Sequence, residues 1–424
     1  MRKVIVQKFG GTSVADTDKI KNVAKTVIRE KENGNDVVVV VSAMGHTTDY
    51  LVKMAKDFGP NPSCREMDML LSTGEGVSIA LLAMAIQAQG YDAVSFNAMQ
   101  IGIMTENVHS KARILDIKTD KLRKNLNEGK IIVVAGFQGV TEDGEITTLG
   151  RGGSDTSAVA LAAALNAERC DIYTDVEGVY TTDPRVVPKA SKLDEISYEE
   201  MLELAHAGAN VLHPRSVETA KHFNVPMRVR SSFKLDNLGT LILGVEKMEI
   251  YKPVTGVAAD LSQARIVVCD VPDKPGVAAK LFTKLANENI SVDMIIQSYA
   301  RKISNTNDIA FTIDMSDLTK TVEALEALKA EIGLDGDIQI NDNIAKVSIV
   351  GAGMIDRPGV ASAMFETLGE QGINIRMIST SEIKISCLVD KDDAQKAVKA
   401  LHEIFELGCD KVAEVKGDLP DELI

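Results

Sequence analysis

The sequence predicts an α/β protein made of two unlike parts: a three-layer α/β/α sandwich with a mostly parallel sheet, followed by two ferredoxin-like βαββαβ domains. Three observations predict this fold. Apolar strand-like runs alternate with helical patterns over the first 245 residues, which is typical of a parallel sheet covered by helices. The rest of the chain contains an internal duplication. A charged stretch with Pro253, at residues 246–256, separates the two patterns.

The hydrophobic period predicts the elements of the first part. Short apolar runs rich in valine and isoleucine predict buried strands, and longer runs with apolar residues three or four positions apart predict helices. Strands are expected at 4–9, 36–44, 131–140, 169–176 and 226–232. Helices are expected at 16–34, 78–90, 154–167, 197–209 and 214–223. Because the strands are apolar throughout, we expect helices on both faces of the sheet.

The second part is a tandem repeat. Residues 273–297 align with residues 356–380 at a constant offset of 83, and ten of the 25 positions are identical. Each copy has the pattern of a strand, a tight turn, a helix, two strands and a second helix, which is the order of a ferredoxin-like unit. The chain is therefore expected to divide into a first domain at 1–245, a linker and entry segment at 246–263, and repeats at 264–340 and 344–424.

Bulk composition argues against several classes of function. The formal net charge is −14, so we expect no basic face for nucleic acid or for an anionic membrane. We also expect no membrane span, which would need a run of roughly 18 apolar residues. Five scattered cysteines without a paired spacing indicate reduced thiols in a cytoplasmic protein. His206 and His213 lack a third ligand at zinc spacing, so structural roles are expected for them and no protein metal site.

The first glycine motif is KFGGTS, residues 8–13, directly after a predicted strand. Its two glycines permit a sharp turn and a close approach of the backbone to a ligand. The amides at the start of a following helix, with the hydroxyls of Thr12 and Ser13, would form an anion site beside the charge of Lys8. The P-loop pattern GxxxxGK[ST] is absent. The hexapeptide alone is equally compatible with a turn that binds nothing.

The second glycine motif is TTLGRGGSD, residues 147–155. Arg151 lies among three glycines, and its guanidinium is suited to a bidentate contact with a carboxylate or phosphate. Asp155 would orient an ammonium group or hold a metal ion through the coordination shell of that ion. An ordinary N-cap would also use Ser154 or Asp155, but a cap needs neither the glycines nor the arginine. Three weaker stretches, for which surface-loop or capping roles stay open, are SAMGHTTD at 42–49, STGEGVS at 72–78 and YTDVEGVYTTDPRVV at 173–187.

Together these motifs resemble the aspartate kinases of the amino-acid kinase superfamily. KFGGTSV, SAMGHTTD, STGE, TTLGRGGSD and YTDVEGVYTTDPR occur in the family's order, and the duplicated part is similar to the family's tandem ACT domains. The resemblance covers nearly the whole chain and indicates the monofunctional form. It implies an amino-acid kinase domain that uses ATP with Mg²⁺ to phosphorylate the side-chain carboxylate of L-aspartate. The product, 4-phospho-L-aspartate, would lead to lysine, threonine and methionine.

The resemblance also implies roles for individual residues. The catalytic residues would be Lys8 and Asp155. The transferring phosphate would meet Lys8, Gly10, Gly11, Thr12 and Ser13, and the nucleotide side would contain Thr174, Asp175, Tyr180 and Arg185. The aspartate site would contain Thr47, Glu75, Arg151, Gly152, Gly153 and Ser154, together with Asp155.

For the repeats, the resemblance implies feedback inhibition by lysine, threonine or both. The effector site would contain Asp273, Gly276, Val292, Asp293 and Gln297 of the first repeat with Asn374 and Ile375 of the second. Homodimers or higher oligomers are expected through these domains. Relatives also produce this part as a separate small subunit from an internal start, for which Met248 is well placed. A purely structural dimerisation role for the repeats remains an alternative.

Two alternative functions stay open. The first is a superfamily kinase for another carboxylate, such as glutamate or N-acetylglutamate, although such relatives usually lack the tandem repeats and an acetylated substrate needs no ammonium partner such as Glu75. The second is a non-catalytic amino-acid sensor, which would predict the loss of Lys8, Arg151 or Asp155, and all three are present. A carboxylate of pKa near ~3.9 is already an ionised nucleophile at neutral pH, so carboxyl phosphorylation would need no general base.

Overall fold

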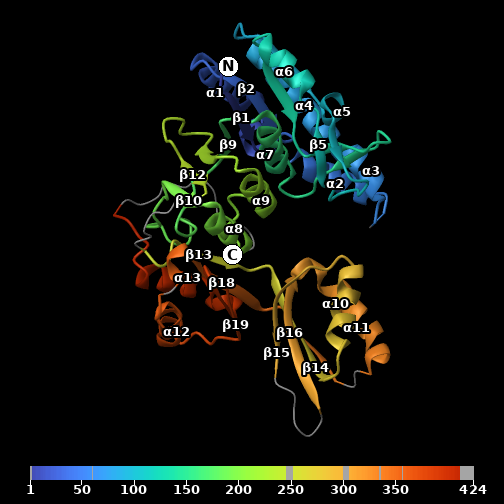
Figure 1. Ribbon diagram of the computed structural model, residues 1–424, viewed down its shortest axis with the longest axis vertical. Helices are drawn as coiled ribbons and strands as arrows, with labels where there is room; N and C mark the ends of the chain where they lie inside the picture. Colours follow the sequence, from blue (N-terminus) through green and yellow to red (C-terminus); the bar gives the residue numbers. More distant parts are fainter. Residues whose placement is uncertain are drawn as a thin grey trace.

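The computed structural model describes residues 2–59, 61–244, 252–298, 305–333, 336–355 and 357–410. A large domain with an eight-stranded sheet lies above two smaller units, each built on a four-stranded antiparallel sheet (Figure 1). We call them the regulatory units, after the role that the resemblance implies. The predicted fold class, a mostly parallel α/β domain followed by two repeated units, is confirmed. Met248, the predicted internal start, lies outside the described residues.

The large sheet has the strand order β10-β12-β11-β9-β1-β2-β6-β3. All neighbouring pairs are parallel except β11 with β12. The central strands are buried on both faces, which explains their unbroken apolar sequences. The strands are β1 (Val4–Phe9), β2 (Asp36–Val41), β3 (Ala93–Phe96), β6 (Ile131–Ala135), β9 (Arg169–Thr174), β10 (Glu195–Ser197), β11 (Met227–Ser231) and β12 (Thr240–Leu243).

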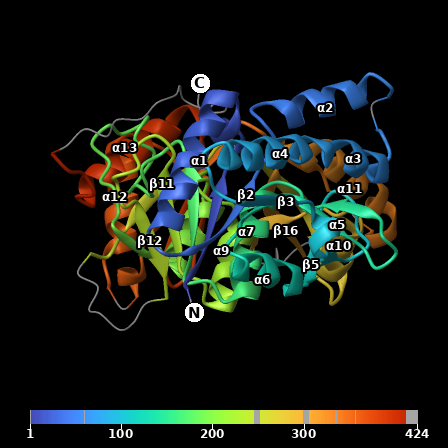
Figure 2. The same cartoon turned by 90° about the horizontal axis from the view of Figure 1, so that it is seen from above.

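Helices cover both faces of this sheet and form a separate hydrophobic core with each. Helices α1 (Thr17–Glu32) and α4 (Thr73–Gln87) pack side by side on one face, with β11 and β12 beyond α1 (Figure 2). The other face is covered by α6 (Asp120–Asn127), α7 (Gly153–Leu165), α8 (Tyr198–His206) and α9 (Pro214–Phe223). Asp16 caps α1 by accepting from Lys19 N at 2.8 Å. The predicted three-layer sandwich is therefore confirmed.

A second, smaller sheet of the large domain has the order β5-β4-β7-β8. The sequence predicted one strand over 131–140, and this prediction is wrong. Strand β6 ends at Ala135, Phe137 has a positive φ of 69°, and β7 belongs to the small sheet. The chain turns at Gly136, which packs closely against Ser154. A Cβ at position 136 would lie 2.7 Å from Ser154 Oγ, so a larger residue would clash there. The elements are β4 (Ile103–Thr105), β5 (Ile114–Ile117), β7 (Gln138–Val140), β8 (Ile146–Thr148), α2 (Thr47–Lys56), α3 (Cys64–Leu71) and α5 (Ala98–Ile101).

Helices α3 and α4 form a nearly continuous run, Cys64–Gln87, that is long and apolar enough by composition to cross a membrane. Leu82 and Ile86 of this run are fully buried in the core between the sheet and α1. That packing is typical of the core helix of a globular domain, which passes the same test of length and composition.

The first regulatory unit follows the predicted order. It consists of β14 (Gln263–Pro272), α10 (Val277–Asn287), β15 (Val292–Gln297), β16 (Thr306–Asp314), α11 (Leu318–Ile332) and β17 (Ile338–Asn341), with η2 (Met315–Asp317) before α11. Its sheet order is β15-β16-β14-β17. The last strand therefore returns beside the first, as in a ferredoxin-like unit.

The second regulatory unit takes one strand from elsewhere. It consists of β18 (Ile344–Val350), η3 (Ala352–Met354), α12 (Val360–Glu370), β19 (Met377–Thr380), β20 (Lys384–Asp390), η4 (Lys391–Asp393) and α13 (Ala394–Ile404). The position beside β18 is filled by β13 (Gly256–Asp260), in the order β13-β18-β20-β19. The segment expected as a linker thus contributes a strand to the second unit and ties that unit to the large domain.

Candidate active site

Lys8 and Asp155, far apart in sequence, meet at the carboxyl end of the large sheet. Lys8 lies near the end of β1, and Asp155 lies in the first turn of α7, which packs on β1. Their atoms Nζ and Oδ1 are 2.6 Å apart, with only 13% of each side chain exposed. The contact is an ion pair and lacks the geometry of a directed hydrogen bond. The two glycine motifs therefore lie side by side.

The loop after β2 joins the two glycine motifs. Ser42 Oγ donates to Ser154 Oγ at 2.9 Å, and Gly45 N donates to Gly11 O at 3.0 Å. Residues Gly11–Val14 form a short 3₁₀ helix, η1, ahead of α1, which begins at Thr17 as the helix predicted over 16–34 required. This short turn brings Ser13 Oγ within 2.7 Å of Ser232 Oγ, beyond the end of β11.

Two glycines are required by close packing in this region. A Cβ at Gly11 would lie 2.9 Å from Ala43 O, and a Cβ at Gly152 would lie 2.2 Å from His213 Cβ. Gly152 also has a positive φ of 67°, which L-residues other than glycine rarely adopt. The glycines thus allow the Arg151 loop and the turn after β1 to approach their neighbours closely.

Glu75 presents a buried carboxyl group with unused hydrogen-bonding capacity. It lies in the first turn of α4 and is 2% exposed. Its Oε1 accepts from Ala43 N at 3.1 Å, and its Oε2 has no hydrogen-bond partner among the described residues. Burial raises the pKa of Glu75 to about 7, and hydrogen bonding from the backbone of Glu75 and Ala43 and from the Gln138 side chain opposes that rise. A cation placed at Oε2 would satisfy the carboxylate and lower this pKa.

The other predicted aspartate-site residues differ in their exposure. Thr47 begins α2, and its Oγ1 donates to Met44 O at 2.6 Å. Arg151 is exposed in the turn after β8, and within residues 2–59 and 61–244 its side chain makes no hydrogen bond or ion pair. Gly153 and Ser154 are buried at the start of α7. Arg151 is therefore an exposed cation on this loop, whereas Lys8 is a cation held in place by Asp155.

The predicted nucleotide-side residues, Thr174, Asp175, Tyr180 and Arg185, all line one cavity of about 410 Å³. Thr174 Oγ1 donates to Asp175 Oδ1 at 3.0 Å. Arg185 makes a bidentate contact with Asp183, at 3.0 Å from Nε and 2.7 Å from Nη2. The far wall of this cavity contains the end of α8 and residues of β13. The cavity therefore lies between the large domain and the regulatory part.

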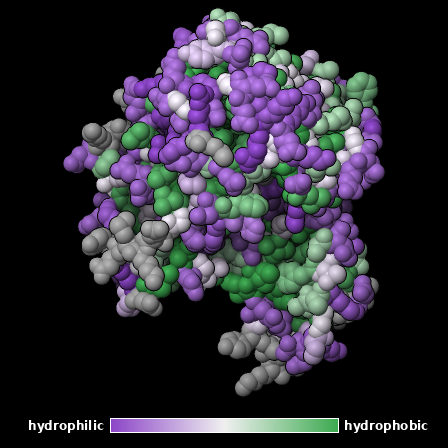
Figure 3. Space-filling model, turned by 45° about the horizontal axis from the view of Figure 1, so that its top comes forward, coloured by the Kyte–Doolittle hydropathy of each residue, from purple (hydrophilic) through white to green (hydrophobic). Residues whose placement is uncertain are grey.

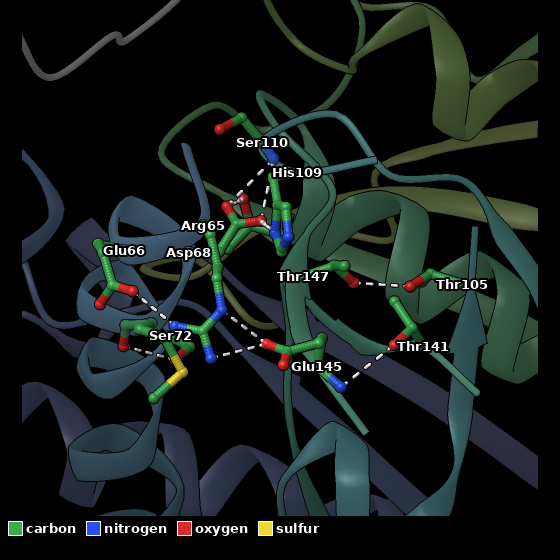
Figure 4. Close-up of polar contacts among 12 residues, drawn as sticks. Arg65, Glu66, Asp68, Ser72, Thr105, His109, Ser110, Thr141, Glu145 and Thr147 are labelled. Atoms are coloured by element: carbon green, nitrogen blue, oxygen red, sulfur yellow. Dashed lines mark hydrogen bonds and ion pairs between the residues drawn. The ribbon is translucent and has the colours of Figure 1, made fainter. Parts of the chain in front are cut away.

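Asp68 organises the strand that leads to the Arg151 loop (Figure 4). Its carboxylate is fully buried and accepts from Thr148 Oγ1 at 2.6 Å, from Ser110 N at 3.0 Å and from His109 Nδ1 at 2.8 Å. Nearby, Arg65 joins α3 to the hairpin before β8 through Glu145, at 2.9 Å. These contacts fix β8, and hence the start of the loop, against α3.

Sequence reasoning missed much of this region: Ser42 received only a passing place, Asp68 and Ser232 received no role, and His213 was expected only to have a structural role. His213 accepts from Arg215 N at 3.3 Å, and burial lowers its pKa while Asp155 opposes that shift. His213 belongs to a helix start far along the chain, so no local spacing signals its contact with Gly152. Among the described residues, no group of three His, Cys, Asp or Glu side chains is arranged to hold a metal ion.

The predicted effector residues lie in both regulatory units. Asp273 accepts from Asn307 Nδ2 at 3.3 Å, and Gly276 caps α10 with a φ of 89°. Val292, Asp293 and Gln297 lie on β15, an edge strand of the first sheet. Asn374 and Ile375 directly precede β19, an edge strand of the second. The two units meet through a small core that includes Met294 and Met377.

Comparisons with known proteins agree with this architecture. A model of the amino acid kinase family matches residues 3–231, and a model of the ACT domain matches residues 266–328 and 347–405. The chain is 56% identical over 404 residues to an aspartokinase of Bacillus sp. (strain MGA3), covering 95% of this chain and 97% of the relative. It is 54% identical to aspartokinase 2 of Bacillus subtilis (strain 168), covering 95% and 98%.

Among solved structures, Escherichia coli aspartokinase III in complex with aspartate and ADP (R-state) matches with a TM-score of 0.82 and 30% identity, covering 95% of this chain and 99% of that one. The same enzyme with lysine and aspartate (T-state) gives a TM-score of 0.72 over 94% and 99%. The fold and the two joined glycine loops thus define an amino acid kinase with paired ACT domains. Within that class, the chain belongs to the aspartokinase family.

Proposed function

We propose that this protein transfers the γ-phosphoryl group of ATP to the side-chain carboxylate of L-aspartate, giving 4-phospho-L-aspartate and ADP in the cytoplasm. The observation that carries the proposal is the 2.6 Å ion pair between Lys8 and Asp155, which lies where the two glycine motifs meet. The five free cysteines are consistent with a reducing compartment. An assay of ADP release over a panel of amino acids tests it: aspartate should be the preferred acceptor, and preference for another amino acid would contradict the assignment.

The chemistry follows from charge. The acceptor carboxylate is ionised at neutral pH, so no base is needed, and the main barrier is repulsion between two anions. Positioning and charge neutralisation therefore supply the catalysis. Lys8 would face the transferring group, with the amides of the turn at Gly10 to Ser13 around it. Mg²⁺ would accompany the nucleotide phosphates and neutralise part of their charge, and Asp155, beside Lys8, is a carboxylate of this chain that would approach it.

The buried carboxyl group of Glu75 favours an acceptor with a free ammonium group. Its unpaired Oε2 would receive the α-ammonium of aspartate, while Arg151 would hold the α-carboxylate. An acetylated acceptor would leave Glu75 without a partner, so N-acetylglutamate should be a poor substrate. A sensor without activity is the remaining alternative, and it predicts no ADP release with any amino acid.

Replacing Arg151 by lysine should chiefly raise the KM for aspartate. Lysine keeps the positive charge but loses the two parallel hydrogen bonds of a guanidinium, a loss that we expect to raise KM by about tenfold. Steady-state kinetics with aspartate and ATP varied separately measure it. The matched control is Arg123→Lys on the exposed surface of α6, which should leave both constants unchanged. An unchanged aspartate KM for the Arg151 variant would remove this role.

The aspartate KM should depend on pH through Glu75. Because its pKa is raised to about 7, Glu75 is largely protonated below that pH and ionised above it. Only the ionised form attracts the substrate ammonium, so the aspartate KM should fall as pH rises through 7 and then level off. Glu75→Gln should raise KM and remove this pH dependence. A titration near pH 7 that persists in the variant would assign it to another group.

For the regulatory part, we propose feedback inhibition by lysine, threonine or both, bound near Asp293 and the start of α10. We also propose that protomers associate through the regulatory sheets. Their edge strands expose Ile295 and Ile296 on β15 and Ile378 on β19, and hydrophobic surface gathers in the lower half of the face in Figure 3. Unpaired, apolar edge strands of this kind favour pairing with another sheet. Sedimentation of the full chain would test the assembly.

A further inference from the structure

A second cavity of about 410 Å³ lies on the opposite face of the large sheet from Lys8. Lys8 pairs in register with Ile172, so Arg169, Asp171 and Tyr173 of β9 alternate to the other face, beside α1. Arg228 and Arg230 of β11 share that face and line the cavity together with Arg169. We call this the arginine pocket. It contains none of the residues assigned above to aspartate, nucleotide or effector.

Carboxylates balance only part of the positive charge in the arginine pocket. Arg169 takes up two of them, because its Nε lies 3.0 Å from Asp171 Oδ1 and its Nη2 lies 3.2 Å from Glu30 Oε1. Asp236 pairs with Arg29 at the rim, at 3.3 Å. Within residues 2–59 and 61–244, neither Arg228 nor Arg230 contacts a carboxylate. The three guanidinium groups of Arg169, Arg228 and Arg230 therefore share the two carboxylates of Asp171 and Glu30.

Arg230 has both a structural task and unused capacity. Its Nη1 donates to Tyr173 Oη at 3.1 Å, and its Nη2 donates to Leu235 O at 2.8 Å. Its Nε is buried and has no partner among the described residues. Arg228 lies two residues away on the same strand face and is half-buried, and its guanidinium has no hydrogen-bond partner in the described part of the chain. Buried donors without acceptors are costly, and guanidinium groups are suited to carboxylate or phosphate oxygens.

We propose that the arginine pocket binds a small oxyanion, whose phosphate or carboxylate oxygens accept hydrogen bonds from Arg228 and Arg230. The pocket is large enough for more than a bare ion, so a phosphorylated or polycarboxylate metabolite fits its chemistry. The bound anion would also neutralise the excess charge on this face of the sheet.

Occupancy of the pocket would act on the nucleotide edge of the active site. Arg230 holds the loop after β11 through the carbonyls of Leu235 and Asn237. The same loop begins at Ser232, which contacts Ser13 of the first glycine turn at 2.7 Å. An anion that fixes Arg230 should therefore order this loop and tighten nucleotide binding. This second effect rests on the proposed kinase function, whereas anion binding itself does not.

Calorimetric titration of the full chain with inorganic phosphate, and separately with citrate, tests the proposal at constant ionic strength. We expect one site for at least one of these anions, weakened tenfold or more in Arg228→Gln and unchanged in the exposed control Arg2→Gln. Phosphate alone would indicate a phosphate ligand, and binding of citrate would extend the class to carboxylates. Absence of binding would overturn the proposal. So would binding that survives Arg228→Gln and disappears in Lys8→Ala, since it would belong to the glycine turn.

Chemical protection provides a measurement that does not depend on the folding of a variant. Phenylglyoxal modifies accessible arginines, and peptide mapping identifies which ones. Phosphate or citrate should slow the modification of Arg228 severalfold without affecting Arg2. Equal modification with and without the anions would contradict the site, whatever the kinase assay shows.

Discussion

Replacing Lys8 by alanine is expected to lower kcat by a factor of about 10² to 10⁴, as for the loss of one preorganised charge that stabilises a transition state. Lys8 is held at the end of β1 by Asp155 at 2.6 Å, with 13% of its side chain exposed. Its ammonium group is thus positioned before substrates arrive. The KM values should change less than kcat, because the charge acts mainly where negative charge develops.

Two controls separate this role from a structural one. Lys3→Ala removes an exposed lysine of the same N-terminal segment, paired with Glu168 at 2.6 Å, and should leave kcat within about twofold, since exposed pairs contribute little. Lys8→Ala leaves Asp155 without its cation, so thermal unfolding must show that the variant remains folded. A folded variant whose loss is confined to KM would contradict the proposed role of Lys8.

The parts of the fold with strong periodicity could be predicted from sequence. The buried strands β1, β2 and β9 and the helices α1, α7 and α9 lie where their patterns indicated. The small sheet was missed because its strands have only three or four residues and carry no clear period. The break at Gly136 is set by packing against Ser154, and the role of β13 is set by pairing with β18. Neither cause is visible in a local sequence window.

The meeting of the two glycine motifs was predictable for a physical reason. Loops that follow parallel strands, and helices that start beside them, gather at one edge of the sheet. Residues held by contacts across the fold were not predictable in this way. Asp68 resembles an ordinary helix residue in sequence, yet it is fully buried and fixes Thr148. The charge balance around Arg228 likewise depends on which side chains share one face of two strands.

One of several contacts between the regulatory part and the large domain is made by a nearly buried lysine, and we expect Lys346→Met to uncouple effector binding from activity. Lys346 lies on β18 with 6% of its side chain exposed, and its Nζ is 2.6 Å from Asp293 of the first unit. The same Nζ donates to His206 O, at the end of α8, at 3.3 Å. It also lies 3.8 Å from Asp260 of β13. His206 and Asp260 both line the cavity that contains the nucleotide-side residues.

An effector ammonium group that binds Asp293 would compete with Lys346 for that carboxylate. The hydrogen bond from Lys346 to His206 O, at the end of α8, would then change. Allosteric coupling typically changes affinity by a factor of about 5 to 150. In Lys346→Met, the ratio of the aspartate KM with effector to that without effector should be close to one. Equilibrium dialysis of the full chain should show lysine or threonine bound as tightly as before, or more tightly, because the competitor is gone. An exposed lysine of α13 provides the matched control, Lys399→Met. Unchanged inhibition in Lys346→Met would show that the signal bypasses this contact, whereas a wild-type chain that binds neither amino acid would instead contradict the proposed feedback.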